Sequence, residues 1–142
     1  MIIQIEPWID HEELDQLKRV IKNTFVTEHE LTKEFESLIK DLTGTKYAVA
    51  ITNGTAALYC CLKALDIGEG DEVIVPNMTF IASANAVIMA NAHPVFCDID
   101  QKTLCIDTNK IESLITPATK AIMPVHLYGQ SAEMDVIMKI AK

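Results

Sequence analysis

The sequence predicts an α/β fold in three layers, with a mainly parallel sheet flanked by helices. From residue 46 onward, short apolar runs alternate with longer segments of helical periodicity, and repeated β-α-β spacing of this kind is typical of parallel sheets. The 142 residues are 49% hydrophobic and include only five glycines and five prolines, which excludes a disordered or low-complexity chain. The chain is therefore long and apolar enough to bury a core.

The N-terminal part is charge-rich and helical in pattern. Asp10 can cap a helix with Glu13 at the capping-box position, and the apolar residues that follow lie on one face: Leu14, Leu17, Val20 and Ile21. A second helix is expected to follow Thr32 and to stop at Gly44, with an apolar side made of Phe35, Leu38, Ile39 and Leu42. Residues 23–30 are mixed in polarity and predict a loop between the two helices.

The alternating elements follow in order. We expect strands at residues 47–52, 72–75, 95–98 and 120–125, and helices at 55–65, 79–90, 109–115 and 132–142. Residues 1–45 are thus assigned to an N-terminal helical segment and 46–142 to an α/β domain. The last helix has no C-cap after Lys142, and four parallel strands with a crossover helix make an unfinished sheet, so we expect the N-terminal part of a longer protein.

Charge and cysteine content exclude several classes of protein. With 12 Lys and Arg against 20 Asp and Glu, the net charge is −8, and no basic stripe is available for nucleic acid. The uncharged stretch 73–97 is broken by proline and asparagine and predicts no membrane span. The four cysteines have no CxxC spacing and are expected to be buried, reduced thiols of a cytoplasmic protein, and the scattered histidines predict no metal site.

The turn after the first predicted strand is a candidate anion site. Gly54 lets a ligand approach the backbone, and Thr55 and Ala56 offer N–H groups at a helix N-terminus, where the helix dipole favours a negative charge. The turn is neither a Walker P-loop nor a GxGxxG fingerprint. The alternative from spacing alone is that Gly54 simply makes a tight strand-to-helix turn.

Two further segments follow strands and so lie at the same carboxyl edge of the sheet, where open α/β sheets bind ligands. The first contains Phe80, which could stack on a planar ring, although a core phenylalanine at a helix start is the simpler interpretation. The second places His126, Tyr128 and Gln130 after the last strand. A lone histidine there is more often a hydrogen-bonded structural residue than a catalytic base.

Six motifs in the right order and spacing then resemble one family from about Leu17 to the end. They are 53–58 (NGTAAL), 68–76 (GEGDEVIVP), 79–86 (TFIASANA), 94–100 (PVFCDID), 115–122 (ITPATKAI) and 124–130 (PVHLYGQ). Each is modest alone, but together they are specific. The chain resembles the DegT family of nucleotide-sugar aminotransferases, within the fold type I group of pyridoxal-phosphate enzymes, and so resembles the first part of their large domain.

The resemblance implies roles for individual residues. It implies that Gly54, Thr55 and Ala56 bind the phosphate of pyridoxal 5'-phosphate, and that Phe80 packs against the pyridine ring. It makes the loop around Thr27 a candidate for contact with the sugar nucleotide, together with Asn53, His126 and Tyr128. The chain departs from the family pattern at residues 29–30, where His-Glu replaces the usual Gly-Pro or Gly-Lys, which affects the expected shape of this loop.

The resemblance also implies what is missing. The aspartate that pairs with the pyridine nitrogen and the lysine that forms the Schiff base are expected beyond residue 142. Lys46, Lys63 and Lys120 lie in the wrong elements to replace that lysine. Without it there is no base for the proton shift, so residues 1–142 alone are expected to be inactive.

The implied function of the parent protein is transamination of a nucleotide-linked keto-sugar, with glutamate or glutamine as amino donor, in polysaccharide biosynthesis such as that of lipopolysaccharide or O-antigen. The implied assembly is a homodimer. Two alternatives stay open from the sequence: a related pyridoxal-phosphate-dependent sugar dehydratase with histidine in place of the lysine, and a non-catalytic remnant.

Overall fold

The computed structural model describes residues 6–24, 26–27 and 30–142 and divides the chain into two compact units, Met1–Ala50 and Ile51–Lys142. The predicted domain boundary at residue 45 lies within the first unit, and the division into domains at that point stays a prediction. Part of the predicted loop at 23–30, His29 included, lies outside the described residues.

The first unit contains helices α1 (His11–Lys22) and α2 (Glu30–Thr43). The predicted capping box is present, since the Asp10 side chain accepts from the start of α1 and the Asp10 N–H donates to the Glu13 carboxylate at 2.8 Å. The predicted stop of the second helix is also confirmed. Gly44 has a φ of +69°, and its N–H donates to the carbonyl of Lys40 at 2.8 Å.

The second unit alternates helices and strands, as predicted. Its elements are α3 (Gly54–Ala64), β1 (Glu72–Pro76), α4 (Ala82–Met89), β2 (His93–Cys97), α5 (Thr108–Ile111) with the 3₁₀ turn Glu112–Leu114, β3 (Thr119–Ile122) and α6 (Met134–Ile140). The strands form a parallel sheet in the order β2-β1-β3, with Ile74 opposite Val95 on one side and Ile122 on the other.

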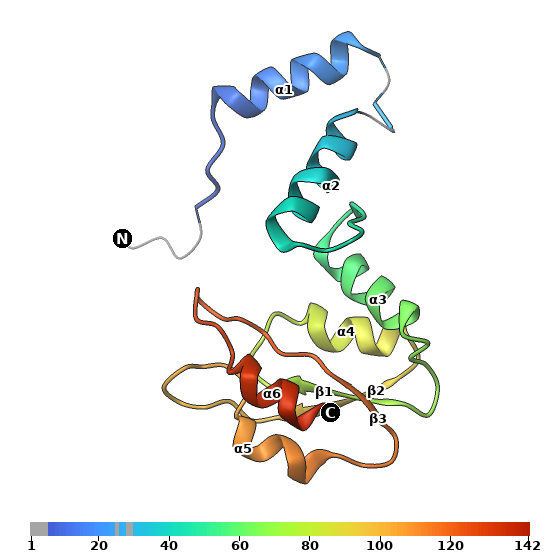
Figure 1. The fold of residues 1–142 in the computed structure, drawn as a ribbon, viewed down its shortest axis with the longest axis vertical. Helices are drawn as coiled ribbons and strands as arrows, with labels where there is room; N and C mark the ends of the chain where they lie inside the picture. The colour runs from blue at the N-terminus through green and yellow to red at the C-terminus, as the bar shows by residue number, and fades with distance from the viewer. Residues whose placement is uncertain (1–5, 25, 28–29) are drawn as a thin grey trace. The chain divides into compact units, whose positions relative to one another are not determined.

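Side chains of the central strand alternate between two apolar cores, one on each face of the sheet. Val73 and Val75 pack with α3 and α4, and Ile74 packs with Ile111 of α5 and Ile137 of α6. In Figure 1, α4 and α5 lie on opposite sides of the sheet. The order of elements explains this arrangement. In the sheet, β2 lies on one side of β1 and β3 on the other, so the connections β1-to-β2 and β2-to-β3 cross the sheet in opposite directions. Because both crossovers are right-handed, their helices lie on opposite faces of the sheet. The predicted three-layer α/β class is confirmed.

The strand predicted at 47–52 is wrong. Residues 47–51 form no strand in the structure, and Tyr47 and Val49 are each 74% exposed. A strand is stable only when its backbone pairs with a neighbour, and no described residues pair with this segment. The apolar run indicates a tendency to be buried in a sheet, but it cannot show that a partner strand is present.

The prediction of buried thiols is half correct. Cys97 and Cys105 are buried in the core around Ile74, whereas Cys60 and Cys61 are exposed, and all four are free. Helix α3 has a core on one side only, where Leu62 is buried against α4, so neighbouring residues of the helix face away from that core. An apolar helical stretch does not reveal how many of its sides are covered.

The central strand gives a prediction about stability. Ile74 is fully buried, so Ile74→Ala would remove three carbons from the core between β1, α5 and α6. We expect a loss of about 2–5 kcal/mol in the free energy of unfolding, measured by urea denaturation. Ile9 is 75% exposed, and Ile9→Ala is the matched control with an expected loss below about 0.5 kcal/mol. Equal losses for the two variants would contradict this packing.

Candidate functional site

The sheet topology opens a crevice at the carboxyl ends of β1 and β3. The chain leaves β1 toward α4 on one face, and it leaves β3 toward α6 on the other face (Figure 1). Open α/β sheets bind ligands at the place where the segments that leave two adjacent strands run to opposite faces of the sheet. A cavity of about 810 Å³ lies here, lined by the start of α3, the start of α4 with the loop before it, and residues 123–127. This volume is in the range of small-molecule sites.

The start of α3 supplies hydrogen-bond donors to this cavity. Asn53 is the N-cap; its side-chain oxygen accepts from the N–H of Ala56 at 2.9 Å, and its carbonyl accepts from Ala57 at 3.0 Å. Ala56 was predicted to offer a free amide, and this is wrong because the N-cap side chain already takes it. The amides of Gly54 and Thr55 have no acceptor among the described residues, so these two remain for an anion.

The space around Gly54 decides between the two interpretations of this glycine. Its φ is not positive, so the turn does not require a glycine conformation. A Cβ built on Gly54 would meet no atom within 4 Å, and the residue lines the cavity. The glycine is therefore not needed to avoid a clash with protein atoms, and its missing side chain leaves open space in the cavity. This favours the close-approach interpretation.

Phe80 is not the core residue that spacing alone suggested. The ring is 75% exposed and lines the cavity. Next to it, the Thr79 and Ser83 hydroxyls share a hydrogen bond of 2.8 Å, and the N–H of Ser83 donates to the carbonyl of Phe80 at 3.1 Å. An exposed aromatic ring at the wall of a cavity suits a planar ligand.

The other predicted site residues are placed differently. His126 lines the cavity, and its Nδ1 accepts from the N–H of Ala132 at 3.0 Å, which requires the proton on Nε2 and fits a structural role. Tyr128 does not line the cavity. It lies with Gly129 at positive φ in a tight turn, which the N–H of Gln130 closes by donating to Leu127 at 2.9 Å. Thr27 is an exposed residue of the first unit.

The described lining of the cavity contains no lysine, arginine or carboxylate side chain. In a chain of net charge −8, an anion there would have to be held by amides, hydroxyls and the dipole of α3.

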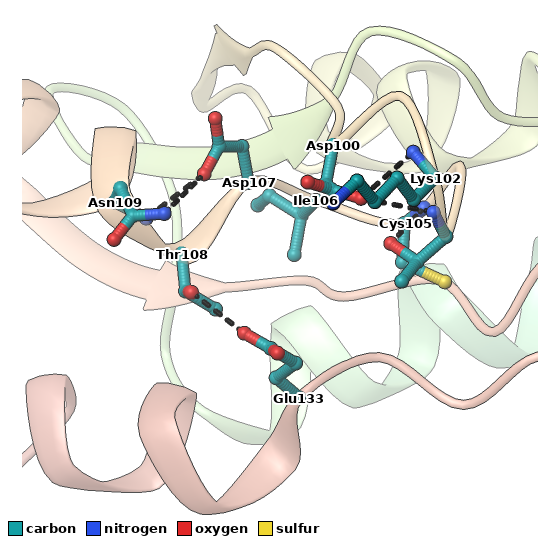
Figure 2. Close-up of a pocket in the computed structure, with 9 residues that line it drawn as sticks. Asp100, Lys102, Cys105, Ile106, Asp107, Thr108, Asn109 and Glu133 are labelled. Carbon is teal, nitrogen blue, oxygen red and sulfur yellow. Dashed lines mark hydrogen bonds between the residues drawn. The ribbon is translucent and has the colours of Figure 1, made fainter.

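A smaller cavity of about 210 Å³ lies between the start of α5 and residues 100–107 (Figure 2). Its carboxylates accept hydrogen bonds from neighbouring parts of the chain. Asp100 accepts from the amides of Lys102 and Thr103 at 2.9 Å each, and Glu133 accepts from the Thr108 hydroxyl at 2.9 Å. The hydrogen bonds to Asp100 hold its pKa below the usual value. These groups connect loops within the protein, and the volume is below the usual range for ligands.

Sequence reasoning missed a polar cluster at the ends of β1 and β2. Asp98 accepts from the Asn77 side chain at 2.6 Å and from Lys110 at 2.9 Å. The hydrogen bond from Lys110, its charge and the bond from Asn77 lower the pKa of Asp98. These residues are 21 and 12 positions from Asp98 in the sequence, so no local pattern indicates that they meet. Ser83, by contrast, follows Thr79 by four residues and could have been placed beside it.

The low pKa of Asp98 predicts a pH dependence. Its pKa is lower in the folded than in the unfolded state, so its stabilisation is present above the unfolded value of about 4 and is lost as the pH falls through the folded value. We expect the stability difference between wild type and Asp98→Asn to be constant from about pH 7 to 5 and to shrink below about pH 4. Urea midpoints measured across this range would check this, and a difference independent of pH would contradict it.

Comparisons with known proteins agree with this geometry. The chain is 47% identical over 137 residues to GDP-perosamine synthase of Caulobacter vibrioides, covering 96% of this chain and 37% of that protein. It is 43% identical to the spore coat polysaccharide biosynthesis protein SpsC of Bacillus subtilis, covering 96% of this chain and 35% of that protein. The chain therefore spans about a third of the length of these relatives.

The crystal structure of NtdA from Bacillus subtilis with bound cofactor PMP superposes on the chain with a TM-score of 0.86 at 34% identity, covering 99% of this chain and 35% of that one. Solved neighbours of this kind confirm the predicted fold type I architecture, of which the chain covers part. No helix in the described part of the chain is long and apolar enough to cross a membrane. The match to the family itself extends over residues 7–142, and the chain belongs to the DegT/DnrJ/EryC1/StrS aminotransferase family.

Proposed function

We propose that the full-length protein is a pyridoxal-phosphate-dependent aminotransferase that aminates a nucleotide-linked keto-sugar. The observation that carries this proposal is a single cavity that combines two free amides at a helix N-terminus with an exposed phenylalanine ring. The first group suits a phosphate, and the second suits an aromatic heterocycle. GDP-perosamine synthase and SpsC, the relatives at 47% and 43% identity, support a nucleotide-sugar substrate and a place in polysaccharide biosynthesis.

The residues present fit this cofactor. The amides of Gly54 and Thr55 would bind the phosphate, and the Thr55 hydroxyl is a further donor beside them. The space where a Cβ of Gly54 would lie leaves room for the phosphate oxygens. Phe80 would pack on the pyridine ring, and NtdA with its bound PMP supports a cofactor of this class. Ala56 contributes through its small side chain, since its amide is already bonded to Asn53.

Pyridoxal phosphate, when bound, supplies the electron-withdrawing ring that allows an amino group to pass between two carbon skeletons. The chain's own residues would hold and orient it. The dipole of α3 and the amides of Gly54 and Thr55 would hold the phosphate, and the Phe80 ring would pack on the cofactor ring and shield it from water. His126, which accepts a hydrogen bond from the N–H of Ala132, forms part of the cavity lining. The proton-transferring lysine and the aspartate facing the pyridine nitrogen would come from the sequence beyond Lys142.

The reaction exchanges an amino group for a keto oxygen. Glutamate would become 2-oxoglutarate while the ketone of the sugar becomes a primary amine, and glutamine is the other donor to be tested. Contacts to the sugar nucleotide are proposed for Thr27, Asn53, His126 and Tyr128. We also propose that the protein works in the cytoplasm as a homodimer.

The test uses the full-length protein loaded with pyridoxal phosphate. Incubation with L-glutamate and each member of a panel of nucleotide-linked keto-deoxyhexoses is expected to release 2-oxoglutarate and to give an amino-sugar nucleotide with one of them, both detected by mass spectrometry. Omitting either substrate should stop sustained release of 2-oxoglutarate. Cofactor binding without product from glutamate or glutamine would argue against this substrate class, and failure to bind the cofactor would overturn the proposal as a whole.

A further inference from the structure

The position of Phe80 is not set by packing. With 75% of the residue exposed, the ring makes few contacts with the rest of the protein. Its place at the cavity wall must then be fixed through the backbone of the loop between β1 and α4. The ring is held in one orientation only if this loop is fixed at both of its ends.

Asn77 anchors the first end. Its N–H donates to the carbonyl of Cys97 at 2.8 Å, which continues the pairing of β1 with β2 by one residue. Its side-chain amide donates to Asp98 at 2.6 Å. Two bonds from one residue thus fix the loop to the end of the neighbouring strand, three positions before the ring.

Asp98 is itself held in place. Its second carboxylate oxygen accepts from Lys110 at 2.9 Å, and its carbonyl accepts from the N–H of Asp107 at 2.9 Å. Asp107 caps α5 by accepting from the N–H of Asn109 at 3.1 Å. The Asp98 carboxylate is charged at neutral pH, as an aspartate of ordinary or lowered pKa is, and a charged acceptor strengthens the bond from Asn77.

Ser83 anchors the other end. Its side chain is buried, its hydroxyl bonds to Thr79, and its N–H bonds to the carbonyl of Phe80 itself. The segment from Asn77 to Ser83 is therefore tied at both ends, and the exposed ring projects from between the two anchors. Neither Asn77 nor Asp98 lines the cavity, so each acts only through the loop.

We propose that Asn77 and Asp98 are positioning residues that hold Phe80 in the orientation needed to pack on the ligand ring. The identity of that ligand as pyridoxal phosphate rests on the proposed function. The anchoring of the loop rests on the hydrogen bonds alone and can be measured without any ligand.

The test variant is Asn77→Asp in the full-length protein. It is isosteric, but at pH 7.5 it sets a second carboxylate against Asp98, beside Lys110 and Asp107, and the link becomes repulsive. In ligand-free protein we expect faster hydrogen exchange in peptides covering 77–83, measured by mass spectrometry. In the loaded protein we expect about tenfold weaker binding of pyridoxal phosphate and a changed visible circular dichroism, on the scale of one lost charge-assisted hydrogen bond.

A control variant separates positioning from a general loss of structure, and a variant of Asp98 tests the other partner of the bond. Asn91→Asp makes the same charge change in the exposed turn before β2 and should leave both readings as in wild type. Asp98→Asn leaves one acceptor oxygen for the two donors Asn77 and Lys110, so it should weaken the same anchor, and we expect faster exchange in peptides covering 77–83 in this variant too. In Asn77→Asp the affinity relative to wild type should recover as the pH falls toward about 5, because the two carboxylates can then share a proton.

Unchanged exchange at 77–83, or unchanged cofactor affinity and dichroism in Asn77→Asp, would overturn the proposal. Faster exchange in a protein whose wild type binds no pyridoxal phosphate would support the anchoring while removing the proposed function. The two claims are thus tested separately.

Discussion

Gly54→Leu in the full-length protein is expected to weaken binding of pyridoxal phosphate by at least about a hundredfold, followed by the absorbance of the bound cofactor. A Cβ at this position meets no protein atom within 4 Å, so the added side chain fills the space in front of the two free amides. Blocking the approach removes charge-assisted hydrogen bonds together with the dipole interaction, each contributing about 1 kcal/mol or more.

The same geometry predicts that stability is kept. Gly54 is the first residue of α3 and needs no positive φ, so replacing it costs no backbone strain, and Gly54→Ala should show a smaller loss of affinity than Gly54→Leu. Gly68→Ala is the control, because the added Cβ makes only ordinary contacts at the other end of α3. Full cofactor binding in Gly54→Leu would remove this turn from the site.

Phe80→Ala carries the second large effect. We expect cofactor affinity to fall by about 10- to 100-fold, in line with about 1–3 kcal/mol for stacking on an aromatic side chain. The free energy of unfolding should change little, because the ring is 75% exposed and belongs to neither core. Phe80→Tyr keeps the stacking surface and should bind nearly as wild type does. Equilibrium dialysis and urea unfolding on the same samples separate the two quantities.

A large loss of stability in Phe80→Ala, with affinity unchanged, would instead support the core interpretation that sequence spacing favours. The site interpretation predicts a loss of cofactor affinity with little change in the free energy of unfolding, and the core interpretation predicts the reverse. The variant therefore tests the structure as well as the site.

The features that could be predicted from sequence are those set by neighbouring residues. The capping box at Asp10 and Glu13 and the glycine stop at Gly44 depend on contacts within a few positions, and both are present. The alternation of elements after residue 51 and the parallel sheet follow from hydrophobic periodicity, because a crossover helix forces parallel strands. The Gly54 turn was located through the start of α3, which follows it directly, although the strand expected before it does not form.

The features that could not be predicted depend on residues far away in the chain. The segment 47–52 has the composition of a strand, but pairing needs a partner that composition cannot show. The exposure of Cys60 and Cys61 depends on which sides of α3 are covered. The bonds from Asn77 and Lys110 to Asp98 exist only because the ends of β1 and β2 are adjacent in the sheet.

The most direct test of the account compares pyridoxal phosphate with pyridoxal, which lacks only the phosphate, in calorimetric titrations of the full-length protein. If the start of α3 binds the phosphate, pyridoxal phosphate should bind at least about a hundredfold more tightly than pyridoxal, and Gly54→Leu should abolish that difference. Equal affinities for the two ligands, or a difference that survives in Gly54→Leu, would contradict the account.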